Sequence, residues 1–496
     1  MDKKMLKHSQ EVIEELIKKE GMSRRDALKL MGLGGAATMM GTAPTSANAA
    51  TEAMASSDKK AKIVIVGGGA GGIMAAARMR RAAPNAEIVL IAPNDIHLYQ
   101  PGQVFMAAGL YTEDDIKKPN SDLMPDGVKW IKDEAKGFDP DNNSVETAKN
   151  GKIGYDFLVV ATGLQYDYER IEGMSPDLVG QKGISSVYLN DPVNGTAKGG
   201  VATWEWFKQV RAEAEKRDPG NPMHVICTQP STPIKCGGAP QKILYLCDDM
   251  LRGNSPLGGN DVHDNAKFTF TKKGGKLFGI KSYNQTLLKL TVDYGNIYDA
   301  FGHDLIGIDA DQKMATFNYH YFEKGEWDED LEEFEVIPMI KKVKMKYDFI
   351  HIVPPMKGVD AVANSPIGWQ KGTAKGWMAA DRYTLQHIKY KNVFGIGDIL
   401  GIPLGKTGGS ARHHGPVLQD NLIAVMEGKE PTAKFDGYTV CPLKTQYGEI
   451  MLAEFNYDGP APSFPLDPSK PRWIWWAFDL YMLKPMYWNL MMRGLM

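Results

Sequence analysis

The fold is decided by the stretch Lys62-Ile63-Val64-Ile65-Val66-Gly67-Gly68-Gly69-Ala70-Gly71-Gly72. Its β-branched first half predicts a buried parallel strand, and the following chain predicts a helix over 73–82 and a second strand over 87–91. Gly67, Gly69 and Gly72 fit the pattern G-x-G-x-x-G, in which they permit a tight turn, close approach of a pyrophosphate, and close packing of helix on strand. The helix N-terminus, with its partial positive charge, would face the phosphates of a bound dinucleotide.

One member of this dinucleotide pattern is missing. The acidic residue that should hold the adenosine ribose at the end of the second strand would fall near Ala92. We therefore expect Asn94 or Asp95, in the next turn, to take its place.

Length, charge and cysteine count narrow the class of protein. The 496 residues predict two or three domains, and the formal net charge of −2 argues against the basic surface of a nucleic-acid-binding protein. The chain contains no Cys-x-x-Cys pattern, so no zinc or iron–sulfur site is predicted. The cysteines, too few and too widely spaced for a disulfide scaffold, are Cys227, Cys236, Cys247 and Cys441.

Residues 1–49 are predicted to form a twin-arginine signal peptide. The pair Arg24-Arg25 is followed by an apolar run rich in Gly and Ala, and then by the small-residue site Ala47-Asn48-Ala49. The run is too short to span a bilayer, and the alternative is a helix N-terminus with two surface arginines. Because this signal directs the export of folded proteins, it predicts a periplasmic location.

Two later segments end in motifs of one class of flavoproteins. A predicted strand over 155–163 ends in Ala161-Thr162-Gly163, and another over 392–398 ends in Gly397-Asp398. Together with the glycine loop, these motifs resemble the pyridine-nucleotide-disulfide-reductase-like flavoproteins. The resemblance implies one FAD, whose ribityl chain donates a hydrogen bond to the late aspartate. The cofactor-binding residues predicted on this basis are Gly67, Gly69, Gly72, Asn94, Gln100, Ala135, Thr162, Gly163, Gly397, Asp398, Lys406 and Thr407.

The second nucleotide site of that class lacks its glycines in this chain. The strand predicted near 223–226 is followed by Pro230, Pro233 and Lys235 where the phosphate-binding turn should lie. We therefore predict that this second unit is degenerate and does not bind NAD(P)H.

Cys236 occupies that same turn. It comes just before a helix predicted over 241–250, with Pro240 in the first turn. The helix N-terminus and the neighbouring Lys235 would both favour its thiolate. On this chemistry alone, the cysteine either acts on a flavin or simply packs in a turn.

The segment 228–246 resembles the region around the first redox cysteine of the sulfide:quinone oxidoreductases. Further matches are His97-Leu98-Tyr99-Gln100-Pro101-Gly102 and Tyr438-Thr439-Val440-Cys441-Pro442-Leu443, and the resemblance covers 62–496. It implies an FAD enzyme that oxidises sulfide or a related sulfur compound and reduces a quinone, with Cys236 and Lys406 as catalytic residues.

The resemblance breaks at the second redox cysteine. In that family it directly follows the Gly-Asp motif, where this chain has Ile399, and the resemblance sets Cys441 outside the redox pair. Neither Cys227 nor Cys247 is an obvious substitute. We therefore expect either that Cys236 works alone, without a redox partner, or that another substrate donates the electrons. Two alternative functions also stay open: a flavocytochrome c sulfide dehydrogenase flavoprotein with a cytochrome c partner, or a flavin electron-transfer subunit without sulfide activity.

The C-terminal residues 473–494 are dense in aromatic residues and Met, but charges interrupt them, so they predict no spanning helix. An amphipathic anchor on the membrane surface fits this composition, and a buried helix pair or a subunit interface is the alternative. The acidic run 326–335 and the basic run 341–346 are predicted to be solvated strands or turns.

The expected fold is α/β, with two Rossmann-like three-layer dinucleotide-binding domains and a C-terminal amphipathic membrane-docking segment. After the signal, we expect the first part of the FAD-binding domain over 60–165 and the second, degenerate unit over 166–345. The return to the FAD-binding domain is expected over 346–435, and the C-terminal region over 436–496. We also expect a homo-oligomer.

Overall fold

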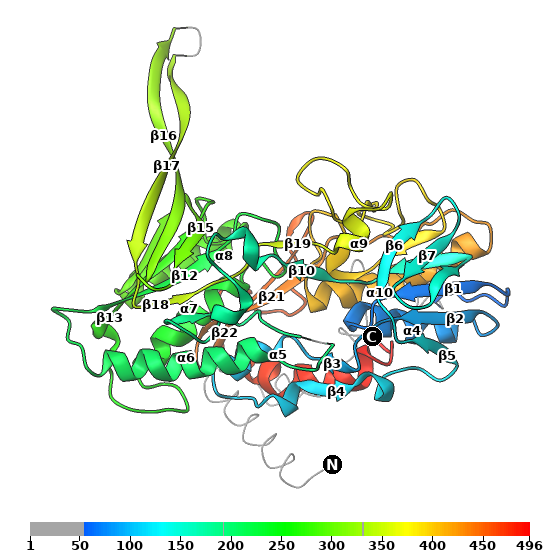
Figure 1. Ribbon diagram of the computed structural model, residues 1–496, viewed down its shortest axis with the longest axis horizontal. Coiled ribbons are helices and arrows are strands. Elements are labelled where there is room, and N and C mark those ends of the chain that lie inside the picture. Colours follow the sequence, from blue (N-terminus) through cyan, green and yellow to red (C-terminus); the bar gives the residue numbers. More distant parts are fainter. Residues whose placement is uncertain (1–53, 192, 330–331) are drawn as a thin grey trace.

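The structure, a computed structural model, describes residues 54–191, 193–329 and 332–496. The predicted signal peptide lies outside the described residues. The described chain has a mixed α/β fold, as the sequence predicts, and Figure 1 shows its two main sheets on the two sides of the molecule.

The first sheet is parallel and contains the predicted glycine-loop strand at its centre. Its strands, in spatial order, are β20 (Val393–Gly395), β9 (Phe157–Val160), β1 (Lys62–Val66), β2 (Glu87–Ile91) and β5 (Val128–Ile131). The helices α4 (Ala70–Ala82) and α10 (Gly408–Met426) pack against each other beside it. The strands predicted at 62–66 and 87–91 are confirmed, because β-branched residues and Gly turns define them locally.

The second sheet is also parallel. Its strands, in spatial order, are β11 (Ile184–Ser185), β18 (Phe349–His351), β12 (Met223–Gln229), β13 (Ala266–Lys272) and β14 (Ile297–Phe301). The helices of this half are α6 (Lys198–Ala214), α7 (Ala239–Leu251) and α8 (Lys281–Tyr294). Because β18 pairs with β12, the chain leaves this sheet only after His351.

Shorter elements connect the two sheets. They are β3 (Ile96–Leu98), α5 (Gly102–Ala107), β4 (Lys117–Pro119), β6 (Ala135–Asp139), β7 (Ser144–Thr147), β8 (Gly151–Gly154), β10 (Leu164–Tyr166), β19 (Met356–Gly358) and α9 (Asp360–Ala363). A separate antiparallel sheet contains β15 (His303–Asp309), β16 (Met314–Asp328) and β17 (Glu333–Lys346). Its last two strands contain the predicted acidic and basic runs and form a long hairpin that projects from the body (Figure 1).

The C-terminal region adds the strands β21 (Thr439–Gln446), β22 (Glu449–Asn456) and β23 (Gly459–Pro460). It ends in a helical segment made of α11 (Trp473–Ala477), the π-helical η8 (Phe478–Leu483), α12 (Lys484–Met486) and the π-helical η9 (Tyr487–Met491).

Several aromatic side chains of this segment are buried in the protein core, whereas an anchor on the membrane surface would direct them toward lipid. Trp475 and Trp476 are buried in the core of the second sheet, and Tyr487 and Trp488 in the core of the first. The described residues contain no helix that is long and apolar enough to cross a bilayer. The segment therefore ties the two halves of the molecule together.

Candidate active site

The glycine loop after β1 has the geometry of a phosphate-binding turn. Gly67 has a φ of +122°, and a Cβ added there would lie 2.2 Å from the carbonyl oxygen of Ala161. A Cβ on Gly72 would lie 1.8 Å from the carbonyl oxygen of Gly67, whereas one on Gly69 would meet nothing within 4 Å. The first and third glycines thus allow close packing and the second leaves open space above the start of α4, which suits a pyrophosphate.

The residues proposed for the ribose lie next to this loop. The Asn94 side-chain amide donates to the carbonyl oxygens of Gly68 (3.3 Å) and Ile96 (3.1 Å), so it also holds the glycine loop in place. Asp95 forms an ion pair with Lys132 at the surface. Asn94 is therefore the better placed of the two candidates.

The other predicted cofactor residues come from several parts of the chain. Thr162 follows β9, and its buried hydroxyl has no hydrogen-bond partner among the described residues. Gly163 has a φ of +71°. Ala135 lies at the start of β6, and Gln100 accepts a hydrogen bond from Lys235. The open glycine loop and the unpaired Thr162 hydroxyl fit a bound dinucleotide.

The Gly-Asp motif forms the short helix η7 (Gly397–Ile399) beside the N-terminus of α10. Burial raises the pKa of the Asp398 carboxyl. The Lys406 ammonium donates to the carbonyl oxygens of Asp398 (2.6 Å) and Leu400 (2.5 Å), and burial lowers its pKa to about 7. Thr407 caps α10, with its hydroxyl accepting from the Ser410 amide. A helix N-terminus and an ammonium thus meet where a reduced flavin would carry negative charge.

Cys236 and Cys441 lie together in the structure, with their Sγ atoms 3.0 Å apart. A disulfide bond is about 2.05 Å long, so the two sulfurs are about 1 Å from bonding distance. The Cys236 amide donates to the carbonyl oxygen of Lys406 at 2.9 Å, which joins the thiol pair to the predicted flavin edge. The structure therefore places Cys441 beside Cys236, a neighbour that the sequence did not predict.

The other cysteines and Ile399 lie elsewhere. Cys227 is buried in β12 and Cys247 in α7, and burial raises the pKa of both thiols. Ile399 is buried in the core around the first sheet, whereas both sulfurs belong to the core around the second.

Close packing of α7 on β21 brings the two sulfurs together. Gly238 caps the N-terminus of α7, and a Cβ at this position would lie 2.8 Å from both Cys441 Sγ and Leu443 Cδ1. At the other end, the Asp249 carboxylate accepts from the Tyr447 amide at 2.7 Å, just after β21. The helix and the strand are thus held at both ends.

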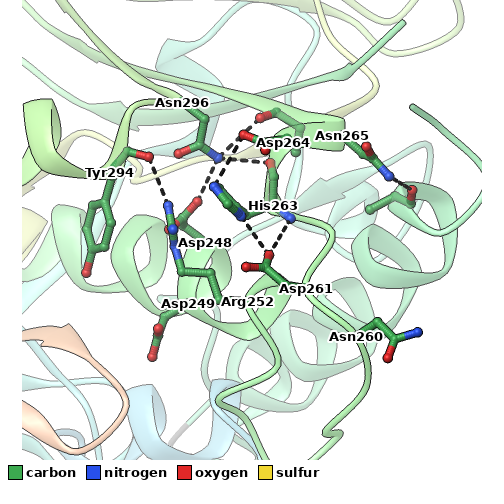
Figure 2. Close-up of polar contacts among 12 residues, drawn as sticks. Asp248, Asp249, Arg252, Asn260, Asp261, His263, Asp264, Asn265, Tyr294 and Asn296 are labelled. Carbon is green, nitrogen blue, oxygen red and sulfur yellow. Dashed lines mark hydrogen bonds and ion pairs between the residues drawn. The ribbon is translucent and has the colours of Figure 1, made fainter. Parts of the chain in front are cut away.

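Buried polar contacts fix the C-terminal end of α7 (Figure 2). Asp248 pairs with Arg252 at 2.8 Å and accepts from the Asn296 amide at 2.7 Å. Arg252 also donates to the carbonyl oxygen of Tyr294 at 2.9 Å. This network anchors the helix whose first turn lies beside the thiol pair.

Two buried lysines surround the thiol pair. The Lys242 ammonium lies 3.7 Å from Cys236 Sγ, and Lys444 pairs with Asp479 at 2.7 Å. The hydrogen bond from the Cys441 thiol, together with the charges of both lysines, outweighs the effect of burial and lowers the pKa of Cys236 to about 6. The hydrogen bond and burial raise the pKa of Cys441. The ammonium groups of Lys242 and Lys444 and the carboxylate of Asp479 together carry one net positive charge, which a thiolate on Cys236 balances.

Lys235 does not have the role predicted for it. Its ammonium donates to Gln100 Oε1 and to the Tyr166 hydroxyl, both at 2.5 Å, rather than to the thiol. Lys242, one turn into α7, is the cation beside Cys236. Helical spacing from the cysteine could have suggested it, but a single lysine in a helix is a weak signal.

A cavity of about 660 Å³ leads to Cys236. Cys236 lies on its wall next to Lys406 and Thr407, and Lys272 lies farther along. Small anions can therefore reach the thiol and the predicted flavin edge through one opening.

Comparisons with known proteins identify the family of the chain. Residues 61–190 match the family model described as pyridine nucleotide-disulphide oxidoreductase. The mitochondrial sulfide:quinone oxidoreductase of Dictyostelium discoideum is 35% identical over 409 residues, which cover 82% of this chain and 80% of that protein. The mitochondrial sulfide:quinone oxidoreductase of Mus musculus is 33% identical over 420 residues, 84% of this chain and 83% of that protein.

Solved structures share the fold. The sulfide:quinone oxidoreductase from Aquifex aeolicus aligns with a TM-score of 0.62 at 21% identity, covering 86% of this chain and 91% of that chain. A chain of the Tetrahymena thermophila mitochondrial ATP synthase aligns with a TM-score of 0.69 at 17% identity, covering 88% and 98%.

The motifs, the glycine-loop geometry and the relatives agree on the cofactor and the class of chemistry. The chain is an FAD-dependent oxidoreductase. Identity above 30% over four-fifths of two relatives also determines its family. The chain belongs to the sulfide:quinone oxidoreductases.

Proposed function

We propose that this chain oxidises sulfide at Cys236 and Cys441 and passes the electrons by way of FAD to a quinone. The observation that carries the proposal is the 3.0 Å distance between the two Sγ atoms, beside the Lys406 loop. The relatives named above support sulfide as donor and quinone as acceptor.

The reaction begins from a disulfide between the two cysteines. A hydrosulfide ion attacks Cys441 Sγ; a bond forms between the incoming sulfur and Cys441, and the bond between the cysteines breaks. Cys236 leaves as the thiolate because the group with the lower pKa leaves faster, and Lys242 stabilises its charge. The products are a persulfide on Cys441 and a thiolate on Cys236.

The persulfide then transfers its outer sulfur. A second hydrosulfide attacks that sulfur, takes it away as a disulfane anion, and leaves Cys441 as a thiol. Re-forming the disulfide releases two electrons and the thiol proton. FAD supplies the two-electron acceptor chemistry when bound, and Gly69, Thr162, Asp398 and the start of α10 would hold it. Quinone receives the electron pair.

Anaerobic titration with sulfide tests the proposal directly. Sulfide should bleach the flavin of the purified holoprotein, and a quinone analogue should restore the absorbance. Cys236→Ser and Cys441→Ser should each lower sulfide:quinone turnover by at least about a hundredfold, because each removes one of two sulfurs needed for exchange. The matched control Cys247→Ala should retain turnover.

The same experiment separates the alternatives. Faster reduction of cytochrome c than of quinone would favour the alternative function, a flavocytochrome c sulfide dehydrogenase flavoprotein. Full turnover in Cys441→Ser would contradict the two-cysteine proposal. NADH should not bleach the flavin, because Pro230 and Pro233 occupy the turn where its phosphates would bind.

We also propose that the enzyme works in the periplasm at the membrane surface. The twin-arginine pattern supports export, and a membrane-soluble quinone requires access to lipid. Exposed Tyr481 and Leu495 in the C-terminal part provide apolar surface for that contact.

A further inference from the structure

The outer half of the β16–β17 hairpin is a two-stranded arm. The short strand β15 pairs with β16 only as far as Tyr319. Beyond that residue, the two strands continue to their tip with no third strand among the described residues, and the arm projects from the body (Figure 1). A lone two-stranded hairpin is marginally stable in water, so an arm of this length gains from a covering partner.

One face of the arm is apolar. In an antiparallel ladder, paired residues share a face, and the register pairs Phe322 with Pro338 and Trp327 with Phe334 on the same side. Their exposures range from 40% at Phe334 to 72% at Phe322. The exposed apolar residues of this face, here called the apolar strip, are Phe322, Trp327, Phe334, Val336 and Ile340.

The opposite face of the arm is already covered by its own side chains. Tyr319 and Tyr321 stack with ring centroids 5.4 Å apart, and the Lys341 ammonium lies over both rings. The apolar strip has no such cover at Phe322, Val336 or Ile340. A partner is therefore expected on one face only.

Charges flank the apolar strip at both ends, with opposite sign. Toward the body, Lys342 and Lys344 lie on the same face as the strip, while at the tip Glu329 and Glu332 follow it. Lys342 and Glu332 lie equally far along the chain from position 337, which is level with the middle of the strip although its own side chain is on the opposite face. This face of the arm thus has a negative end, a positive end, and a middle that is apolar apart from Lys324, whose ammonium lies over the Phe334 ring.

We propose that the apolar strip is the dimerisation surface for a second copy of this chain. Two arms pack face to face and antiparallel around a twofold axis, so that each strip covers the other. Glu332 of each arm then lies over Lys342 of the other, as a self-complementary twofold contact requires. No other partner needs to be assumed to match both the apolar middle and the two charged ends.

The position and charge of the arm argue against a lipid surface as its occupant. The arm points away from the C-terminal helical segment, which lies on the other side of the molecule (Figure 1). Its tip carries glutamates, which an anionic membrane surface repels.

Sedimentation of the flavin-loaded full chain over a range of concentrations tests the proposal. The protein should dimerise, and the double variant Phe322→Ser/Ile340→Ser should weaken the dimer by on the order of a hundredfold, since central apolar contacts dominate such interfaces. The matched control Ile337→Ser, on the opposite face, should leave the dimer intact. Flavin content and sulfide:quinone turnover should stay unchanged in all variants.

A charge exchange tests the antiparallel arrangement separately. Lys342→Glu/Lys344→Glu should weaken the dimer, and adding Glu329→Lys/Glu332→Lys in the same chain should restore it. A wild-type monomer at all concentrations, or a dimer insensitive to Phe322→Ser/Ile340→Ser, would overturn the proposal. Loss of liposome binding in that double variant, with no change in oligomeric state, would assign the strip to lipid instead.

Discussion

Gly238 permits the closest approach in the thiol site. A methyl group at this position would collide with Cys441 Sγ and with Leu443. We therefore expect Gly238→Ala to push α7 from β21, to cost about 1–3 kcal/mol of stability, and to lower sulfide:quinone turnover about tenfold or more. Flavin content should persist, because the glycine loop of β1 is far along the chain. The paired control Gly237→Ala, whose Cβ would meet nothing within 4 Å, should retain turnover, and equal losses in both variants would contradict the packing argument.

The charge of Lys242 determines when Cys236 is a thiolate. A neighbouring cation favours the thiolate, so Lys242→Gln should raise the pKa of Cys236 from about 6 by about one to two units. In a Cys441→Ser background, whose serine can still donate a hydrogen bond, the thiolate should give a long-wavelength band with oxidised flavin. That band should disappear as the pH falls through the pKa, and it should disappear at a higher pH in Lys242→Gln. Lys235→Gln should not change the pH at which half of the band is lost. A change in that pH would mean that Lys235, as first predicted, also stabilises the thiolate.

At the residue scale, the local sequence predicted a role for Cys236 but not for Cys441. Cys236 precedes a helix, and that context is visible in the sequence. Cys441 lies inside a strand and meets Cys236 only because the strand packs against a segment 205 positions earlier. The sequence also gives no sign of the role of Lys242 and Lys444. They lower the pKa of Cys236 because they are buried near it, and residue type alone does not reveal that position.

At the element scale, the C-terminal segment has two kinds of surface. Its Trp side chains pack inward, while Tyr481 and Leu495 are exposed. We expect Tyr481→Asp/Leu495→Asp to release the protein from liposomes with flavin retained, because aspartate is costly in the interfacial region. Val292→Asp, at a more exposed apolar position on α8, should not change binding. Unchanged co-sedimentation of the double variant would place the membrane contact elsewhere.

The elements of the first sheet could be predicted closely, because short continuous stretches of sequence determine the glycine turns and the β-branched strands. The C-terminal segment could not, because Trp, Tyr and Met suit a membrane interface and a core equally well. The hairpin was recognisable as two charged strands, but its apolar face depends on the register of Phe322 opposite Pro338. Composition alone does not reveal that register.

At the scale of the whole molecule, export should depend on Arg24 and Arg25. Replacing both with Lys should leave the precursor in the cytoplasm, because the twin-arginine route requires the arginine pair. Cell fractionation should find that precursor folded and yellow with flavin. A second variant, Lys29→Gln, should still be exported, and normal export of the double lysine variant would refute the signal.

The distance in sequence between the two sulfurs also determines the order of events during synthesis. Cys236 leaves the ribosome 205 residues before Cys441. At about 5–20 residues per second, the nascent chain carries Cys236 without its partner sulfur for about 10–40 s. During that interval neither β21 nor the C-terminal segment exists to cover it. The sulfur pair is therefore among the last parts of the molecule to be assembled, and a prematurely terminated chain would present an unprotected nucleophile to every oxidant in the cytoplasm.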